Sequence, residues 1–111
     1  MVDEIWGWHF IEADRLRDDS RAGAPGEVET YRRKLEICIS GLHFSTHLLH
    51  AMIYAPRPSR WLRRVSSAVA DIGMSDSDKL VTSRRKVHWQ VAVADVFPFA
   101  ARQFALDVAH L

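Results

Sequence analysis

The stretch from Cys38 to Pro58 reads Cys-Ile-Ser-Gly-Leu-His-Phe-Ser-Thr-His-Leu-Leu-His-Ala-Met-Ile-Tyr-Ala-Pro-Arg-Pro, and it contains the change from strand to helix that decides the fold. Gly41 permits a backbone turn that a side chain would obstruct, and Ser45 is a favourable N-cap. Prolines 56 and 58 end a helix because they lack an N–H and restrict the residue before them. The stretch therefore predicts a strand end, a turn and an amphipathic helix over residues 45–55.

The predicted helix has an apolar face and a polar face. At 3.6 residues per turn, the stripe expected to face the core consists of Leu48, Leu49, Met52 and Ile53. The opposite, solvent-facing side consists of His47, His50, Ala51 and Tyr54.

The rest of the chain shows mostly the two-residue period of strands. Over residues 4–11, Trp6, Trp8 and Phe10 fall on one face. Over residues 87–93, one face carries Val87, Trp89, Val91 and Val93. Further strands are predicted at 28–31, 35–40, 61–72 and 79–83. A turn is predicted at 73–78, and a loop that we expect to be mobile at 18–26. A second helix is predicted at 95–109, capped by Asp95. This order predicts one α+β domain over residues 1–111 with a mainly antiparallel sheet.

The composition is that of an ordinary globular protein. The chain has 111 residues, 48% hydrophobic and 26% charged, which suits a single core. No apolar run approaches the roughly 18 residues of a membrane span, so we expect a cytoplasmic protein with no membrane partner. The only cysteine, Cys38, agrees with a reducing compartment. The net charge is +1, which gives no global argument for a polyanionic partner.

A metal site is the first chemical candidate within the central stretch. Its residue types suit zinc, and the ligands would be Cys38, His43, His47 and His50. The sequence has no pair of cysteines and no His-Glu-x-x-His pattern, and two of these histidines, His47 and His50, are predicted to face solvent. We therefore favour solvated histidines and predict no metal.

A basic segment follows the central stretch. Arg57, Arg60, Arg63 and Arg64 surround Trp61, and arginines neutralise phosphates while an exposed indole stacks on a base. The protein is near neutral, however, and a strand tryptophan most often lies in the core. Direct binding of nucleic acid is therefore the less favoured interpretation.

Two segments resemble the ADP-ribosyltransferase fold. They are Trp8-His9 on an early strand and Gly41-Leu42-His43-Phe44-Ser45 before a helix that ends at Tyr54-Ala55. The resemblance implies NAD as cofactor, with His9 at the nicotinamide ribose and His43, in the turn before the helix, as the second site residue. His43 stands where that family has tyrosine, and the late catalytic glutamate is missing because the last glutamate is Glu36. A catalytic transferase is therefore disfavoured, and a nucleotide- or NAD-binding relative remains as the alternative.

The chain as a whole resembles a family of small uncharacterised phage and prophage proteins. The resemblance runs from Trp8 to Leu111 and rests on Trp8-His9-Phe10, Cys38-Ile39-Ser40-Gly41-Leu42-His43 with Ser45, Tyr54-Ala55-Pro56 and Asp78-Lys79-Leu80-Val81. The sequence departs from the family pattern at Phe44, at His50 and over residues 66–69. The resemblance implies origin and fold and leaves the mechanism open.

Together these observations favour a binding module over an enzyme. We hypothesise a phage or mobile-element protein that acts in the host cytoplasm and blocks or modulates a host macromolecule. The target would be a bacterial defence complex (an anti-CRISPR-like role) or a nucleic-acid-processing complex. The partner-binding surface is predicted from residue types enriched at interfaces. It comprises His47, His50, Tyr54, Arg57, Arg60, Arg63 and Arg64. A structural virion component is a further alternative.

Overall fold

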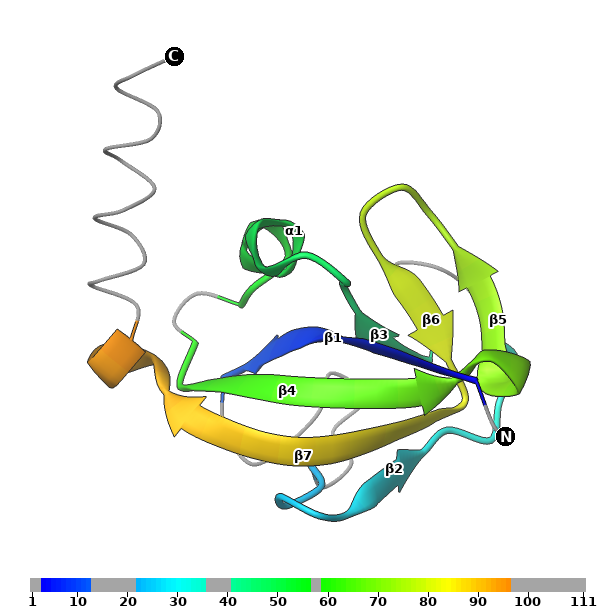
Figure 1. Cartoon of the computed structure of the whole chain (residues 1–111), viewed down its shortest axis with the longest axis horizontal. Helices are drawn as coiled ribbons and strands as arrows, with labels where there is room; N and C mark the ends of the chain where they lie inside the picture. The colour runs from blue at the N-terminus through cyan, green and yellow to red at the C-terminus, as the bar shows by residue number, and fades with distance from the viewer. Residues whose placement is uncertain (1–2, 13–21, 36–40, 57–58, 97–111) are drawn as a thin grey trace.

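The computed structural model describes residues 3–12, 22–35, 41–56 and 59–96. Its larger sheet has four strands in the order β1-β4-β7-β2, all antiparallel (Figure 1). These strands are β1 (Glu4–Ile11), β4 (Trp61–Ala68), β7 (Arg84–Ala92) and β2 (Val28–Thr30). The smaller sheet has the order β3-β6-β5, also antiparallel, and comprises β3 (Leu42–Phe44), β6 (Leu80–Thr82) and β5 (Ile72–Ser75).

Besides a helical turn that begins at Val93, the described residues contain two short helices. The α-helix α1 spans Leu48–Ile53, and the 3₁₀-helix η1 spans Val69–Asp71 between β4 and β5. The α+β class with mainly antiparallel sheet, predicted from the sequence, is confirmed. Among the residues that the structure describes, no helix is both long and apolar enough to cross a bilayer.

The two sheets meet where β1 passes the end of β3. The backbones of Trp8 and Ser45 exchange two hydrogen bonds, of 2.7 and 3.1 Å. Gly7 permits this approach, since a Cβ there would overlap the Phe44 ring and the Ser45 carbonyl oxygen. Phe44 then packs into a core with Val65 of β4 and Val87 of β7. The smaller sheet is therefore fixed to the inner face of the larger one.

The outer face of the larger sheet is covered at one end by α1. Ala51 packs against Phe10 of β1 and Leu62 of β4. Partly buried apolar side chains surround this contact, namely Trp8, Leu48, Met52, Ala55, Val91 and Val93. The other end of this face carries no part of α1, and the candidate site extends from the edge of the α1 contact toward this uncovered end.

The helix predicted at 45–55 is present but shorter, and only Leu48 and Met52 of its predicted core stripe pack against the sheet. Ser45 does not cap the helix, because its backbone pairs with Trp8; the N-cap is His47, without a side-chain cap. Leu49 and Ile53 are 52% and 66% exposed, whereas Ala51 is buried. A small side chain lets the helix approach the sheet closely, so the helix is rotated relative to the predicted stripe.

Other element boundaries also differ from the prediction. The strand expected at 61–72 ends at Ala68, and η1 interrupts it before β5, which occupies part of the predicted turn at 73–78. Leu35, predicted to begin a strand, is not in one, and residues 36–40 lie outside the described part of the chain. The last helical turn begins at Val93 and not at Asp95, and residues 97–111 are likewise outside it. Residues 18–21 of the predicted loop at 18–26 lie there too, and residues 22–26 are in neither a helix nor a strand.

Candidate functional site

The outer face carries three tryptophans near an arginine, from the edge of the α1 contact, where Trp8 packs, toward the uncovered end. We call this set the tryptophan–arginine face, and it consists of Trp6, Trp8, Arg64, His88 and Trp89. Alternation along β1 places Trp6 and Trp8 on the same side. The register then places Trp8 opposite Arg64, and Arg64 opposite Trp89, in one row across β1, β4 and β7. Three strands thus contribute to one surface.

A β-bulge in β7 brings Trp89 to this face. Arg64 pairs with Trp89, but the next residue, Val65, pairs with Val87, so His88 is the extra residue. Because the bulge shifts the alternation by one residue, Val87 points to the core while Trp89 points outward. The prediction that Val87 and Trp89 share a face was therefore wrong.

The side chains of this face contact one another through their π systems. The Trp6 and His88 rings stack with centroids 3.8 Å apart and an interplanar angle of 17°. The Arg64 guanidinium carbon lies 4.4 Å from the Trp8 ring centroid and 5.6 Å from that of Trp6. Trp89 meets Trp8 edge to face at 5.8 Å. The rings therefore surround the guanidinium and hold one another in place.

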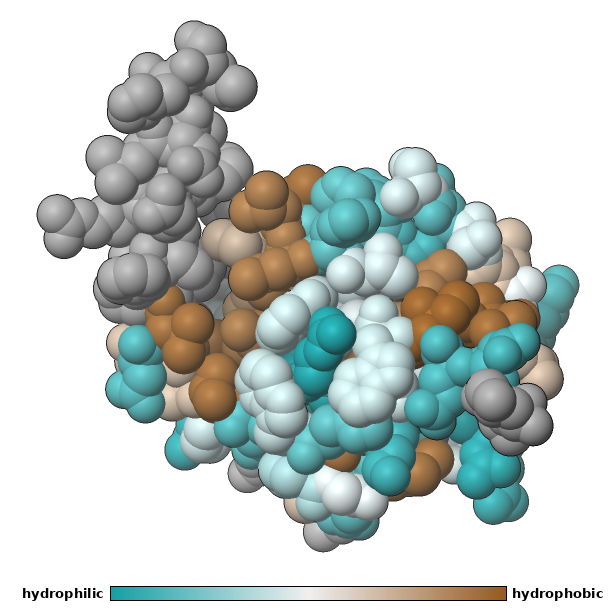
Figure 2. Space-filling model, viewed as in Figure 1, coloured by the Kyte–Doolittle hydropathy of each residue, from teal (hydrophilic) through white to brown (hydrophobic). Residues whose placement is uncertain are grey.

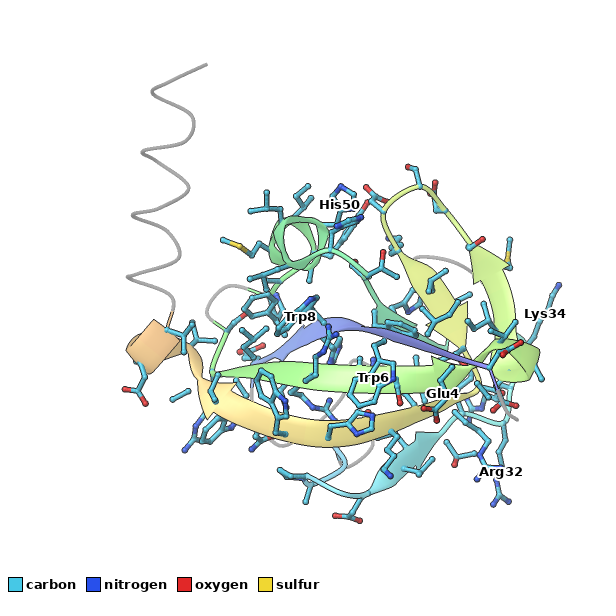
Figure 3. All side chains as sticks on the ribbon, viewed as in Figure 1. Glu4, Trp6, Trp8, Arg32, Lys34 and His50 are labelled. Atoms are coloured by element: carbon cyan, nitrogen blue, oxygen red, sulfur yellow. The ribbon has the colours of Figure 1, made fainter. Side chains whose placement is uncertain are left out.

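This face remains open to solvent in spite of those contacts. Trp6 is 42% exposed and Trp89 43% exposed. Figure 3 shows Trp6 and Trp8 extending from β1 on the side that faces the viewer. In Figure 2, seen from the same direction, the middle of the larger sheet is white and teal, with brown apolar areas to either side. Exposed tryptophans gathered on one face indicate a binding surface more strongly than scattered apolar residues do.

Among the described residues of β1, β4 and β7, cations outnumber carboxylates on the side of the tryptophans. The register places Lys86 in one row with Ser66 and Trp6, and Lys86 and Arg84 are both exposed. Glu4 is the acidic residue of β1 on this side. Partial burial is the largest cause that lowers the pKa of His88, and the charge of Lys86 is the next. The charge of Arg64 lowers this pKa further, whereas that of Glu4 opposes the shift. The His88 imidazole, 2.7 Å from the Ser66 hydroxyl, is thus favoured in its neutral form, which suits stacking on Trp6.

The inner face of the same sheet holds a buried ion cluster. Glu29 of β2 accepts from Arg85 at 2.8 Å and lies 3.0 Å from Arg63. It also accepts from the Gly23 backbone N–H at 2.9 Å. Burial raises the pKa of Glu29, but the guanidiniums of Arg85 and Arg63 and these hydrogen bonds outweigh it, so the net shift is downward. Glu29 is therefore held as the carboxylate between two buried cations.

His9 lies beside this cluster in a neutral state. Its Nδ1 is 3.2 Å from an Arg63 guanidinium nitrogen, and a guanidinium can only donate. Nδ1 must therefore accept, which leaves the ring proton on Nε2. Burial, and then the charges of Arg85, Arg63 and His43, lower the pKa of His9 well below its usual value.

The structure divides the predicted partner-binding surface into separate places. Near α1, the His47 and His50 rings meet edge to face at 5.3 Å. The Tyr54 hydroxyl donates to Asp78 at 2.7 Å, and the Lys79 ammonium lies 3.9 Å from the Tyr54 ring centroid. Tyr54 is thus tied to the loop before β6.

The four arginines of that predicted surface do not act together. Arg63 is completely buried by its ion pair with Glu29, so it cannot contact a partner, and its assignment to a surface was wrong. Arg64, its neighbour on β4, points the opposite way, into the tryptophan–arginine face. Arg60 is exposed and lies 5.4 Å from the Trp61 ring centroid. Arg57 lies outside the described residues.

The metal site considered from the sequence lies partly outside the described residues. Cys38 lies outside the described residues, and the three histidines proposed with it do lie within them. Within ranges 3–12, 22–35, 41–56 and 59–96, no group of three or more His, Cys, Asp or Glu side chains is arranged to hold a metal ion.

The sequence signal for the tryptophan–arginine face is the Trp-x-Trp alternation of Trp6 and Trp8. This alternation predicts a strand, but it does not indicate which of the two strand faces is covered. Comparison with known proteins supplies no further guide: no family model, curated protein or solved structure matches this chain.

Proposed function

We propose that this chain is a binding module of phage or mobile-element type that engages a macromolecule of its bacterial host. The observation that carries the proposal is the solvent exposure of Trp6 and Trp89 beside Arg64 on an open sheet face. Tryptophan and arginine are the residue types that most often dominate binding energy at interfaces. Blocking or modulating a bacterial defence or nucleic-acid-processing complex is the role that fits such a module.

The rigidity of the face supports this proposal. The rings are fixed by stacking on His88 and by the guanidinium between them, so little side-chain freedom is lost on binding. A face that served only folding would instead be expected to bury its tryptophans, as the α1 end of the same sheet buries Phe10.

The test is capture of a partner from a bacterial lysate by the tagged protein, followed by mass spectrometry. A host complex that is retained by the wild type and lost by Trp6→Ser/Trp89→Ser supports the proposal. Met74→Ser is the matched control, because Met74 is 46% exposed but lies on the smaller sheet. Equal capture by all three proteins would remove the tryptophan–arginine face from the proposal.

NAD or nucleotide binding is a second candidate, favoured by one observation. The bridge between Trp8 and Ser45 sets β1 beside β3, which brings His9 and His43 within electrostatic range. Of these two histidines, His9 would donate a hydrogen bond from its Nε2–H to a ribose hydroxyl of the ligand. Glu29 does not supply the missing catalytic carboxylate, since both buried guanidiniums already engage it. The candidate is therefore binding without transfer.

The thermal midpoint measured with and without millimolar NAD tests this second candidate. A ligand that binds only the native state raises the midpoint. A rise that His9→Gln removes would support NAD binding, and an unchanged midpoint would contradict it.

A further inference from the structure

We propose that the partner of the tryptophan–arginine face is a single-stranded nucleic acid. This inference rests on the binding function proposed above and adds the chemical class of the partner. It differs from the nucleic-acid hypothesis of the sequence analysis, because that one relied on Trp61 and on Arg63, which is buried.

The first argument is the arrangement of the rings. Trp6 and Trp8 occupy consecutive same-face positions of β1, so their Cα atoms are roughly 6.6 Å apart. Trp89 lies across β4 from Trp8, in the same row. Aromatic side chains spaced over an open antiparallel sheet are a known platform for two or three unpaired bases, an analogy that concerns surface chemistry and not topology.

The second argument is charge complementarity. Arg64, Lys86 and Arg84 lie on this side of the sheet, and among the described residues of β1, β4 and β7 the one carboxylate there is that of Glu4. Within the described residues, Arg64 contacts two tryptophan rings and the Gly7 carbonyl, and none of these is an anion. Its charge therefore remains available to a phosphate. A nucleic acid offers bases that stack on the tryptophan rings and phosphates that pair with the cations.

The third argument favours single strands over duplexes. In a duplex the bases stack on each other, so their faces do not reach a tryptophan. Reading a duplex groove takes an inserted helix or ribbon, whereas this surface is one side of a sheet beside the place where α1 packs. Unpaired bases can lie on that surface with their backbone along the cations.

The test uses the full chain and fluorescein-labelled oligothymidylate of about ten nucleotides, a length within the usual site size. Fluorescence anisotropy gives the dissociation constant, and the same oligonucleotide annealed to its complement is the duplex probe. We expect the single strand to bind more tightly than the duplex. Loss of one stacked base corresponds to about 5- to 150-fold weaker binding for Trp6→Ser or Trp89→Ser. Met74→Ser should bind as the wild type does.

Salt dependence tests the cations separately. The slope of log Kobs against log salt is about −0.7 per phosphate neutralised on a single strand. Lys86→Gln should therefore make the slope shallower by about 0.7, without changing the preference for single strands. Far-UV circular dichroism of each variant confirms that it is folded.

The outcomes separate this inference from the proposed function. No binding of the single strand, together with tryptophan-dependent capture of a nuclease-resistant host complex, overturns the nucleic-acid inference and identifies the partner as a protein. Single-strand binding that persists in Trp6→Ser/Trp89→Ser also overturns it, because another surface is then responsible. Failure of both oligonucleotide binding and lysate capture overturns the proposed function as well.

Discussion

At the scale of single residues, neighbouring arginines on β4 have opposite roles. Arg63 is buried against Glu29, and Arg64 lies between exposed tryptophan rings. Successive residues of a strand point to opposite faces, so the alternation itself separates them. The predicted partner-binding surface included both arginines, because arginine is a residue type enriched at interfaces. A buried pair requires a carboxylate partner, and Glu29 lies 34 positions earlier in the chain.

The first prediction concerns Glu29, whose charge offsets two buried guanidiniums. Glu29→Gln keeps the shape but leaves Arg63 and Arg85 buried without a compensating anion. Removing one partner of a buried pair costs about 3–5 kcal/mol, so we expect the free energy of unfolding to fall by that amount. Urea denaturation measures it. Glu12→Gln, which removes an exposed carboxylate at the end of β1, is the control, and an equal loss in both variants would contradict the buried-cluster argument.

The second prediction concerns pH and His9. Its pKa is lowered in the folded state from the usual 6.5, so below that pH the unfolded chain binds a proton that the folded chain does not. Stability should therefore be full above about pH 6.5 and fall with decreasing pH, by up to ~1.4 kcal/mol per pH unit. The lowered pKa of His88 acts in the same direction. The pKa of Glu29 is also lowered, so its contribution is lost only below its own usual value of 4.5.

His9→Gln provides the check on this pH dependence. The glutamine amide oxygen can still accept from Arg63, but the side chain does not titrate. Denaturant unfolding measured between pH 7 and pH 5 should give a shallower decline for the variant than for the wild type. Identical declines would show that His9 is not the group responsible.

At the scale of elements, the strongest local patterns were the most predictive. The alternation over residues 4–11 predicted β1 with its observed bounds, and Gly41 adopts the positive φ, 112°, that the predicted turn requires. The Val/Ser/Ala run of residues 65–70 crosses from the end of β4 into η1, so composition alone did not mark the break there. The bulge at His88 depends on pairing with β4, which is not a local property. Because the orientation of Trp89 depends on that bulge, the tryptophan–arginine face could not be assembled from the sequence.

The third prediction concerns the junction of β1 and β3. In Gly7→Ala, the added Cβ overlaps Phe44 and the Ser45 carbonyl, and overpacking of this kind costs about 1–3 kcal/mol. We expect the amides of Trp8 and Ser45, which bond across the junction, to lose their protection from hydrogen exchange selectively.

Gly26→Ala is the matched control for that junction. Gly26 has φ 91° with no atom near the position of a Cβ, so the substitution costs only backbone strain of about 1–2 kcal/mol. Its loss of protection should follow global stability, with no excess at Trp8 and Ser45. An excess of equal size in both variants would argue against a steric junction at Gly7.

At the scale of the whole molecule, the two sheets share one core and should unfold together. Phe44 of the smaller sheet packs on Val65 and Val87 of the larger one. All four tryptophans lie on the larger sheet, in β1, β4 and β7, so tryptophan fluorescence reports that sheet alone. Far-UV circular dichroism reports both sheets. The two signals can therefore show whether the sheets are coupled.

The fourth prediction uses Val81 of β6, which is fully buried in the smaller sheet and carries no fluorescent group. Val81→Ala removes two buried carbons, and at ~0.8 kcal/mol each this costs about 1.6 kcal/mol before any cavity contribution. If the shared core couples the sheets, the fluorescence transition in urea should move to lower denaturant by the same amount as the dichroism transition. Met74→Ala, an exposed position on the same small sheet, should move neither. A dichroism change that precedes an unshifted fluorescence transition would mean that the smaller sheet unfolds independently, and that the tryptophan–arginine face can persist without it.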